Sequence, residues 1–159
     1  MSNLIQADWK PVEPFPFNAA RKSFTGPTSG EGFLALKYFQ TPAGDLRAIA
    51  SFGPQSEGAP GQVHGGMILT VLDEALGAAA WLAGHPVLTV RLQTEFRLSV
   101  PVRTEMLVTA RLTRVRHKLV FVEGDLLGED GRRYAGAKGE FMELGEDAQR
   151  RIFGRTHGA

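Results

Sequence analysis

The sequence predicts a single α+β domain with one long helix and about six β-strands. Two observations indicate this fold class. Only the stretch from about Gly65 to Ala83 has the periodicity of a long amphipathic helix. Runs rich in β-branched and aromatic residues, bounded by turn signals, lie on both sides of it. A chain of 159 residues is long enough for one domain with its own hydrophobic core.

Residues 1–30 are expected to form an arm outside the central sheet. Prolines interrupt this stretch, so it cannot continue as a regular helix or a central strand. Its aromatic side chains favour burial, and the arm should therefore pack on the body of the domain, with a short helix near residues 18–23. The prolines are Pro11, Pro14, Pro16 and Pro27, and the aromatic residues are Trp9, Phe15, Phe17 and Phe24.

The main domain is expected over residues 31–145 and should begin with a hairpin. Residues 33–39 and 46–52 have the composition of strands, and residues 41–45 have that of a turn. Residues 54–62 are rich in proline and glycine, which predicts a loop.

The helix that follows has a coherent apolar stripe. In a projection at 100° per residue, five residues fall within about 60° of Ile68. They are Val71, Leu72, Ala75, Ala79 and Leu82. Gly84, followed by His85 and Pro86, is a natural stop for this helix.

Four strands are expected after the helix, joined as a meander. Their ranges are residues 87–100, 102–116, 118–129 and 133–144. The tripeptide Arg116-His117-Lys118 and the dipeptide Asp130-Gly131 favour turns. Residues 146–159 are expected to be a short polar C-terminal tail.

The composition excludes several classes of protein. With 18 Lys and Arg against 17 Asp and Glu, the net charge is +1, so there is no overall basic field for nucleic acid. The absence of cysteine excludes disulfides, thiolate metal sites and a cysteine nucleophile. The N-terminus lacks the features of a signal peptide, and there is no uninterrupted stretch of 18 apolar residues. We therefore expect a soluble, cytoplasmic protein without a membrane partner.

The sequence of residues 61–77, GQVHGGMILTVLDEALG, places polar groups at both ends of an apolar segment. Gly65 and Gly66 lie at the start of the helix, where unpaired backbone N–H groups and the helix dipole can bind a ligand oxygen. They could equally serve only as a tight turn into the helix. Asp73 and Glu74 lie off the apolar stripe, where a solvated face and a functional role are both open.

The spacing within this motif has a geometric consequence. His64 and Asp73 are nine positions apart, about 13 Å along a helix and nearly half a turn around it. One helix therefore cannot bring Asp73 to a carbonyl bound at its own N-terminus. If both act together, the acid comes from a second copy of the chain, whose helix packs antiparallel across a two-fold axis.

The motif and the element order resemble the hotdog-fold acyl-CoA thioesterases of the PaaI-like and THEM4-like group. The resemblance covers about residues 31–144 and rests mainly on His64-Gly65-Gly66, Asp73-Glu74 and Gly77. Weaker matches are Thr89, residues 95–101 and the basic turn that ends in Lys118. It implies a hotdog fold, in which one long central helix is wrapped by an antiparallel sheet of about six strands.

The resemblance also implies roles for particular residues. Asp73 would be the catalytic carboxylate, as nucleophile or as base toward water, with Glu74 as the competing acid. The Gly65 N–H would polarise the thioester carbonyl, with Gly66 beside it. His64 would orient the turn, and Thr89 would position the water or the acid. This chemistry needs no metal and no cofactor apart from the coenzyme A of the substrate.

Basic residues between positions 91 and 118 have two interpretations. They are either solvated strand positions or a patch for an anionic ligand such as the phosphates of coenzyme A. The candidates for the second role are Arg91, Arg97, Arg116 and Lys118.

The expected partner is a second copy of the chain, in a homodimer or a tetramer formed from two dimers.

Three positions depart from the family pattern. Gly58 stands where several relatives carry Asn or Gln, and Arg103 and His117 stand where glycine is common. A non-catalytic acyl-CoA-binding or regulatory hotdog protein is kept as the alternative function, because a fold alone does not imply a function. A serine hydrolase or a zinc enzyme is not indicated, because no Gly-x-Ser-x-Gly context occurs and the four histidines lack ligand-like spacing.

An acyl or aryl pocket could be lined by Met67, Trp81, Phe96 and Phe121, which could equally be core residues.

Overall fold

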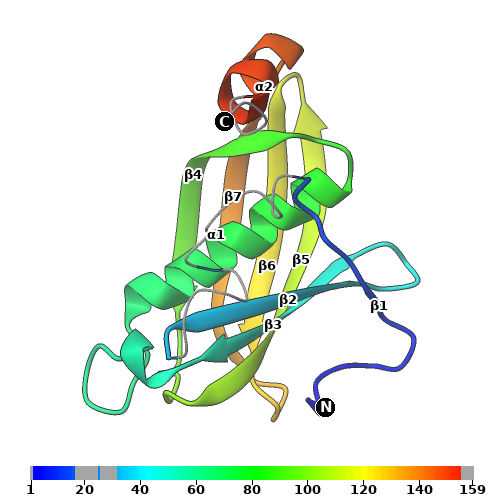
Figure 1. Ribbon diagram of the computed structural model, residues 1–159. Helices are drawn as coiled ribbons and strands as arrows, with labels where there is room; N and C mark the ends of the chain where they lie inside the picture. Colours follow the sequence, from blue (N-terminus) through cyan, green and yellow to red (C-terminus); the bar gives the residue numbers. More distant parts are fainter. Residues whose placement is uncertain (1, 17–24, 26–31, 155–159) are drawn as a thin grey trace.

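The computed structural model describes residues 2–16, 25 and 32–154. In this part of the chain, one antiparallel sheet of seven strands curls around one long helix (Figure 1). The elements are β1 (Lys10–Pro11), β2 (Leu34–Gln40), β3 (Leu46–Phe52), the 3-10 helix η2 (Pro54–Ser56), α1 (Gly65–Leu82), β4 (Val87–Phe96), β5 (Thr104–Arg116), β6 (Leu119–Leu127), β7 (Arg133–Glu143) and α2 (Glu146–Phe153). The predicted α+β class and the central helix are confirmed.

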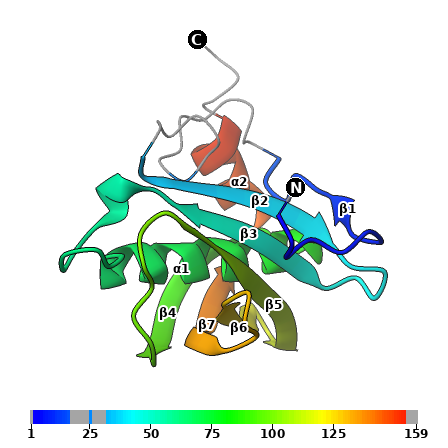
Figure 2. The same cartoon turned by 90° about the horizontal axis from the view of Figure 1, so that it is seen from below.

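The helix α1 lies in the hollow of the curved sheet. Figure 2 shows β2 and β3 on one side of α1 and strands β4 to β7 on the other. Its buried face includes Ile68, Val71, Leu72, Ala75, Leu76, Ala78, Ala79 and Ala80. The small alanine side chains allow close approach to the sheet, and their burial contributes hydrophobic stabilisation without a large loss of side-chain entropy. α1 has the length and the mean hydropathy, 1.3, of a membrane-spanning helix, but in this structure it is the core helix.

Both ends of α1 agree with the sequence-based expectation. His64 is the N-cap, and its imidazole accepts a hydrogen bond from the Gly66 N–H. At the other end, Ala83 is the C-cap, and Gly84 follows with a φ of 90°, a conformation that glycine adopts without strain.

The expected meander over the last four strands is wrong in one respect. Strands β5, β6 and β7 are consecutive neighbours, but β4 pairs with β7 and lies at the edge of the sheet. The place beside β5 is taken by β3. The physical reason is that α1 carries the chain across the sheet, so β4 begins at the far edge. The pattern of side chains along a strand specifies its faces but not its neighbours.

The N-terminal arm contacts the body at two places. Trp9 packs on Phe39 and Ile49, and Phe15 joins the main core beside α1. Between them, β1 adds two residues to the edge of β2. The predicted helix near residues 18–23 lies outside the described residues.

The C-terminal segment contains the helix α2, which the sequence analysis did not predict. Glu146 and Asp147 lie in its first turn and Arg150 and Arg151 in its last, a distribution that complements the helix dipole. The ring of Phe153, at its end, packs edge-on against Trp81 of α1 with 5.4 Å between ring centroids. This tertiary contact stabilises a helix too short to be stable alone.

The turns follow the sequence-based expectation. Residues 41–45, 117–118 and 128–132 connect antiparallel strands. Arg103 and His117, the two positions that depart from the expected family pattern, have φ values of 63° and 53°. In the described part of the chain these are the only non-glycine residues with positive φ, a conformation that glycine adopts without strain.

Candidate functional site

The N-terminus of α1 presents one free backbone donor. The Gly66 N–H donates to His64 Nδ1 at 2.8 Å, so it is already satisfied. The N–H groups of Met67 and Ile68 donate to the carbonyl oxygen of His64. Within the described ranges the Gly65 N–H has no hydrogen-bond acceptor. Of the two glycines, Gly65 is therefore the one that can donate to a ligand oxygen.

Two glycines leave room for the imidazole of His64. A Cβ at Gly66 would lie 3.0 Å from His64 Nδ1, and a Cβ at Gly58 would lie 2.9 Å from the His64 Cα. Because Gly58 packs against His64, any side chain at position 58 would require a shift of His64. Since Nδ1 accepts from Gly66, the proton of the neutral imidazole is on Nε2.

The predicted pair of Asp73 and Thr89 is in direct contact. The Thr89 hydroxyl donates to Asp73 Oδ1 at 2.8 Å. Asp73 comes from the middle of α1, and Thr89 comes from the start of β4, sixteen positions later in the chain. The hydrogen bond fixes one carboxylate oxygen and leaves Oδ2 available to a water molecule or a substrate carbon.

A pocket of about 150 Å³ opens beside this pair, between α1 and the first residues of β4. Asp73, Glu74 and Thr89 are the polar residues of its lining. Its other walls are apolar, and they are formed by Phe15, Gly77, Trp81, Val87, Leu88, Phe141 and Phe153. The carboxylates therefore face an apolar space of the size of a small organic group.

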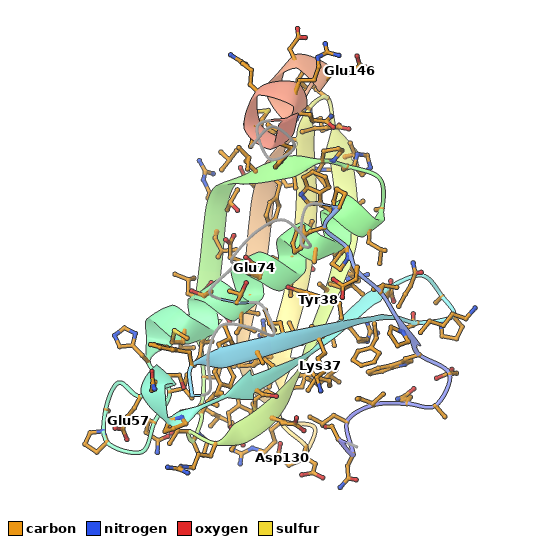
Figure 3. The ribbon with its side chains drawn as sticks, viewed as in Figure 1. Lys37, Tyr38, Glu57, Glu74, Asp130 and Glu146 are labelled. Carbon is orange, nitrogen blue, oxygen red and sulfur yellow. The ribbon has the colours of Figure 1, made fainter. Side chains whose placement is uncertain are left out.

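Aromatic side chains in and beside this pocket pack on one another. Phe15 packs edge-on against both Tyr38 and Trp81, with ring centroids 6.1 and 6.3 Å apart. The Tyr38 hydroxyl donates to Glu74 Oε2 at 3.5 Å, and Figure 3 shows the two side chains on β2 and α1. The Trp81 indole donates to the Val87 carbonyl at 3.3 Å, which fixes its orientation. Glu74, unlike Asp73, is thus held by the β2 side of the fold.

Gly77 is the small residue in the wall of the pocket formed by α1. It lies one turn after Asp73 and one turn before Trp81. Glycine in a helix interior costs about 1 kcal/mol relative to alanine. A Cβ at this position would meet Phe141 Cε1 at 3.7 Å, an ordinary contact, so packing alone does not require glycine.

The four basic residues expected at a phosphate site do not converge in one protomer. Arg91 pairs with Glu140 at 3.4 Å, and Arg97 pairs with Glu95 at 3.3 Å. Arg97 follows Phe96, whose ring lies over Gly65 at the N-terminus of α1. Arg116 and Lys118 lie in or beside the β5–β6 turn, next to Glu143 at the end of β7. Arg97 thus lies at the opposite end of the sheet from Arg116 and Lys118, and Arg91 lies between them.

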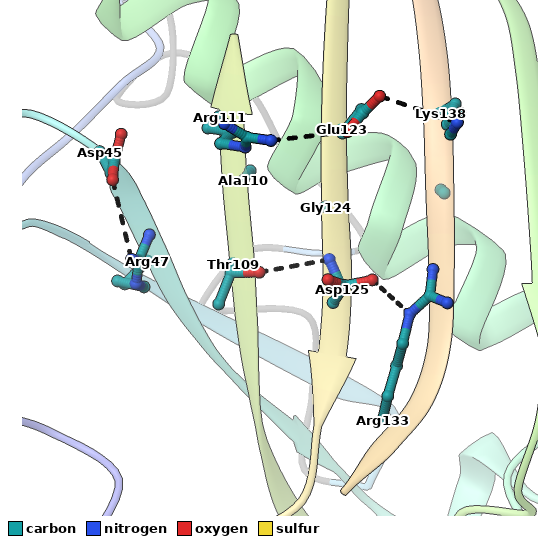
Figure 4. Close-up of a pocket in the computed structure, with 11 residues that line it drawn as sticks. Asp45, Arg47, Thr109, Ala110, Arg111, Glu123, Gly124, Asp125, Arg133 and Lys138 are labelled. Carbon is teal, nitrogen blue, oxygen red and sulfur yellow. Dashed lines mark hydrogen bonds and ion pairs between the residues drawn. The ribbon is translucent and has the colours of Figure 1, made fainter. Parts of the chain in front are cut away.

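A larger pocket, about 430 Å³, lies on the face of the sheet turned away from α1 (Figure 4). Its charged side chains pair with one another across the strands. Glu123 lies between Arg111 and Lys138, and the carboxylate of Asp125 binds Arg133. In the larger pocket, the charged side chains are thus paired with one another. The smaller pocket instead combines a carboxylate with apolar walls. The smaller pocket is therefore the candidate site.

The four predicted pocket residues have different environments. Trp81 lines the pocket, while Met67 packs on the main core. The ring of Phe96 covers Gly65, and Phe121 lies under the Arg114 guanidinium, 4.2 Å from ring centroid to Cζ. Sequence reasoning missed Phe15, Phe141 and Phe153. The proline-aromatic pattern of the arm was the only signal for Phe15, and no local pattern pointed to Phe153.

The site is divided along α1. Gly65 and Asp73 are eight positions apart, about 12 Å on a helix. The free N–H and the carboxylate of one protomer therefore do not reach the same carbonyl group. Among the described residues, no three histidine or acidic side chains are grouped so that they could hold a metal ion.

Comparison with known proteins identifies the fold. Residues 60–135, from the loop before α1 into β7, match the family model of the thioesterase superfamily. The chain is similar to this superfamily over that segment and has the hotdog fold of its solved members.

Individual relatives agree with this assignment. The chain is 28% identical to the human acyl-coenzyme A thioesterase THEM5 over 118 residues, covering 72% of this chain and 47% of that protein. It is 27% identical to the THEM4 thioesterase of Bos taurus over 138 residues, covering 86% of this chain and 57% of that protein. The chain thus spans about half the length of the curated relatives that it matches.

Solved structures show the same fold. A thioesterase superfamily protein matches with a TM-score of 0.65 and 26% identity, covering 69% of this chain and 54% of that one. A Streptococcus mutans protein whose crystal structure contains acetyl-CoA matches with a TM-score of 0.66 and 17% identity, covering 79% and 94%.

Proposed function

We propose that this protein is an acyl-CoA thioesterase that hydrolyses a thioester to a free acid and coenzyme A. The observation that carries the proposal is the Thr89 to Asp73 hydrogen bond at the mouth of an apolar pocket. It combines an oriented carboxylate with a space for an acyl group. The similarity to acyl-CoA thioesterases supplies the reaction class, and no cofactor apart from the coenzyme A of the substrate is needed.

In the proposed reaction, Asp73 acts on the thioester carbonyl carbon. As a base, it takes a proton from water while the water oxygen bonds to the carbon; as a nucleophile, its Oδ2 bonds to the carbon first and water releases the acid. In both cases the carbon–sulfur bond breaks and coenzyme A leaves as the thiol. The Gly65 N–H stabilises the negative charge on the carbonyl oxygen in the transition state.

The complete site requires two protomers. The strand β4 is an open edge of the described sheet and exposes large apolar side chains, Leu88, Val90 and Phe96. Such an edge favours pairing with another strand. When two β4 strands pair antiparallel about a two-fold axis, the α1 helices also run antiparallel beside each other.

The position of the two-fold axis follows from the spacing on α1. If Asp73 of one protomer lies near Gly65 of the partner subunit, the axis passes close to residue 69, midway between them. Leu69 is 38% exposed, and its side chain would meet the same residue of the partner on this axis. Apolar exposure at the predicted axis supports the shared site.

Two solved hotdog proteins support coenzyme A as the carrier. One Streptococcus pneumoniae structure contains coenzyme A, and the Streptococcus mutans structure contains acetyl-CoA. Crystal structures of the S. pneumoniae protein also exist with an aspartate or a threonine replaced by alanine. These two positions are sixteen residues apart in that protein, the same spacing as between Asp73 and Thr89.

The test is hydrolysis of a panel of acyl-CoA substrates, followed with a thiol-reactive dye. Wild-type protein should release coenzyme A from at least one substrate, and Asp73→Asn should lower kcat/KM by about 10²- to 10⁴-fold. Asp130→Asn, the same change in the β6–β7 turn, is the matched control and should retain the wild-type rate. Asp130 already accepts a local bond from the Arg132 N–H, which Asn can also accept.

Two results would overturn the proposal. If no acyl-CoA is hydrolysed but titration calorimetry detects acyl-CoA binding, the protein is the non-catalytic binding or regulatory alternative. If Asp73→Asn retains the full rate, the catalytic carboxylate has been assigned wrongly.

A further inference from the structure

The pocket beside Asp73 has a definite size and chemistry. Its volume is about 150 Å³, and apart from the polar residues of its lining its walls are aromatic and aliphatic side chains. A closed apolar cavity of about this volume holds one benzene molecule, and this pocket has a similar volume but is partly open to solvent beside Leu88, which is 48% exposed. A space of this kind next to the carboxylate accommodates a small apolar group attached to the reacting carbonyl.

Gly77 lines the pocket and has no side chain that could occupy it. A Cβ there would make only an ordinary contact with Phe141, so a larger residue would fit the core and occupy the pocket. Glycine disfavours the helix, and the fold gains no close packing from it in return. The space that Gly77 leaves is therefore the feature that distinguishes it from alanine.

Part of the apolar wall comes from two segments that flank the hotdog core. Phe153 belongs to α2 and Phe15 to the N-terminal arm, and both rings pack edge-on against Trp81. Neither segment lies within residues 60–135, which match the superfamily. This part of the wall is thus built by parts of the chain outside the shared family region.

We propose that this pocket binds the acyl group and limits it to a single aromatic ring or a straight chain of about six carbons. Gly77 leaves the pocket open, and Phe153 of α2 blocks longer chains. This inference rests on the proposed thioesterase function and specifies its substrate class. Gly77 and Phe153 are specificity-determining residues, whereas Asp73 and Thr89 act on the reacting atoms.

The first test shortens the wall at Phe153. Wild type, Phe153→Ala and Ile152→Ala are compared on butyryl-, hexanoyl-, decanoyl-, palmitoyl- and phenylacetyl-CoA. Wild type should prefer hexanoyl- and phenylacetyl-CoA. Phe153→Ala should raise the ratio of kcat/KM for decanoyl-CoA over hexanoyl-CoA by about tenfold or more, the scale set by a few methylene contacts. Ile152 is the adjacent, exposed residue of α2 and does not line the pocket, so Ile152→Ala should keep the wild-type ratio.

The second test adds a side chain at Gly77. It does not depend on whether α2 still packs against Trp81. Gly77→Ala and Gly77→Leu add one and four carbons to the wall. Relative to butyryl-CoA, kcat/KM for hexanoyl- and phenylacetyl-CoA should fall slightly for the alanine variant. It should fall by about tenfold to 200-fold for the leucine variant. A graded shift in substrate ratio, with butyryl-CoA still hydrolysed, separates loss of space from loss of folding.

The outcomes distinguish the two proposals. If wild type hydrolyses none of the panel, the thioesterase function fails before the pocket is tested. If wild type is active but both series leave the chain-length profile unchanged, or if palmitoyl-CoA is the preferred wild-type substrate, the pocket assignment fails while the function stands.

Discussion

At the scale of single residues, the hydrogen bond from Thr89 to Asp73 determines how the carboxylate is presented. A β-branched threonine in a strand has few rotamers, so its hydroxyl holds a fixed direction toward Oδ1. Without this bond the carboxylate can rotate about its last torsion. The orientation of Oδ2 toward a carbonyl carbon is thus set from β4 rather than from α1.

Replacing Thr89 by valine keeps the shape and removes the hydroxyl. A hydrogen bond to a charged group contributes about 1.5–3 kcal/mol, so kcat should fall by about 10- to 100-fold while KM changes little. Thr89→Ser should recover most of the rate. Steady-state kinetics with the best acyl-CoA of the panel measures these values.

The control for this prediction is Thr113→Val, which removes another exposed threonine hydroxyl from the sheet. That hydroxyl donates to the Phe121 carbonyl, remote from Asp73. An unchanged kcat in Thr89→Val would mean that Asp73 does not need orientation, and the role of Thr89 would have to be abandoned.

At the scale of elements, α1 is both the core helix and a wall of the pocket. Its buried face is part of the main core, and Asp73 and Gly77 line the pocket beside β4. These two requirements conflict at Gly77, where the helix would be more stable with alanine. Glycine at position 77 therefore makes α1 less stable than alanine would, at a position where a side chain would occupy the pocket.

We expect Gly77→Ala to raise the free energy of unfolding by up to about 1 kcal/mol. The reason is the lower backbone entropy of alanine in the unfolded chain, since the added Cβ makes an ordinary contact. Urea unfolding at constant protein concentration measures the change. The matched control is Gly84→Ala: its φ of 90° should make the same substitution destabilising. A loss of stability in Gly77→Ala would show that the helix cannot accept a Cβ there.

Local patterns in the sequence predicted most elements, because helix and strand periodicity depend on neighbouring residues. The limits of α1 followed from the glycines before it and after it, and the pair of strands before it followed from their turn. The edge position of β4 was not predictable in this way, since it results from the crossing of α1. α2 was missed because its stability depends on the contact between Phe153 and Trp81, far apart in the chain.

The same distinction applies to the candidate site. Asp73, Gly65 and His64 lie in one continuous motif, and their positions on α1 were predicted from spacing alone. Thr89 was indicated only by family resemblance, and the structure brings it to Asp73. The resemblance also singled out Arg103 and His117, whose positive φ values are a conformation that favours glycine. The aromatic wall of the pocket depends on long-range packing and could not be predicted.

At the scale of the whole molecule, the division of the site along α1 can be tested by mixing two inactive variants. Gly65 is the first residue of α1, a position where proline is well tolerated, so Gly65→Pro removes the N–H with little effect on the helix. His64 has φ −60° and ψ 135°, which is compatible with a following proline. Gly65→Pro and Asp73→Asn should each be nearly inactive alone.

After the two variants are mixed and allowed to exchange subunits, activity should return to about one quarter of the wild-type rate. Half of the dimers would then be mixed, and each mixed dimer would have one of its two sites intact. The control adds Leu69→Asp to both variants. This change places two like charges at the predicted axis, and it should abolish rescue and give monomers in sedimentation velocity. Activity in such a monomer, or no rescue between exchanging dimers, would contradict the shared site.

The two edges of the sheet differ in a way that limits how far association can proceed. The edge formed by β4 has ten residues and exposed apolar side chains. The opposite edge ends in β1, which has two residues, one of them Pro11 without an N–H to donate. In the described part of the chain, β1 covers only the Phe39–Gln40 end of β2, so the β4 edge is the longer uninterrupted one. Antiparallel pairing of two β4 strands uses that edge on both molecules, so pairing of this kind ends at two copies.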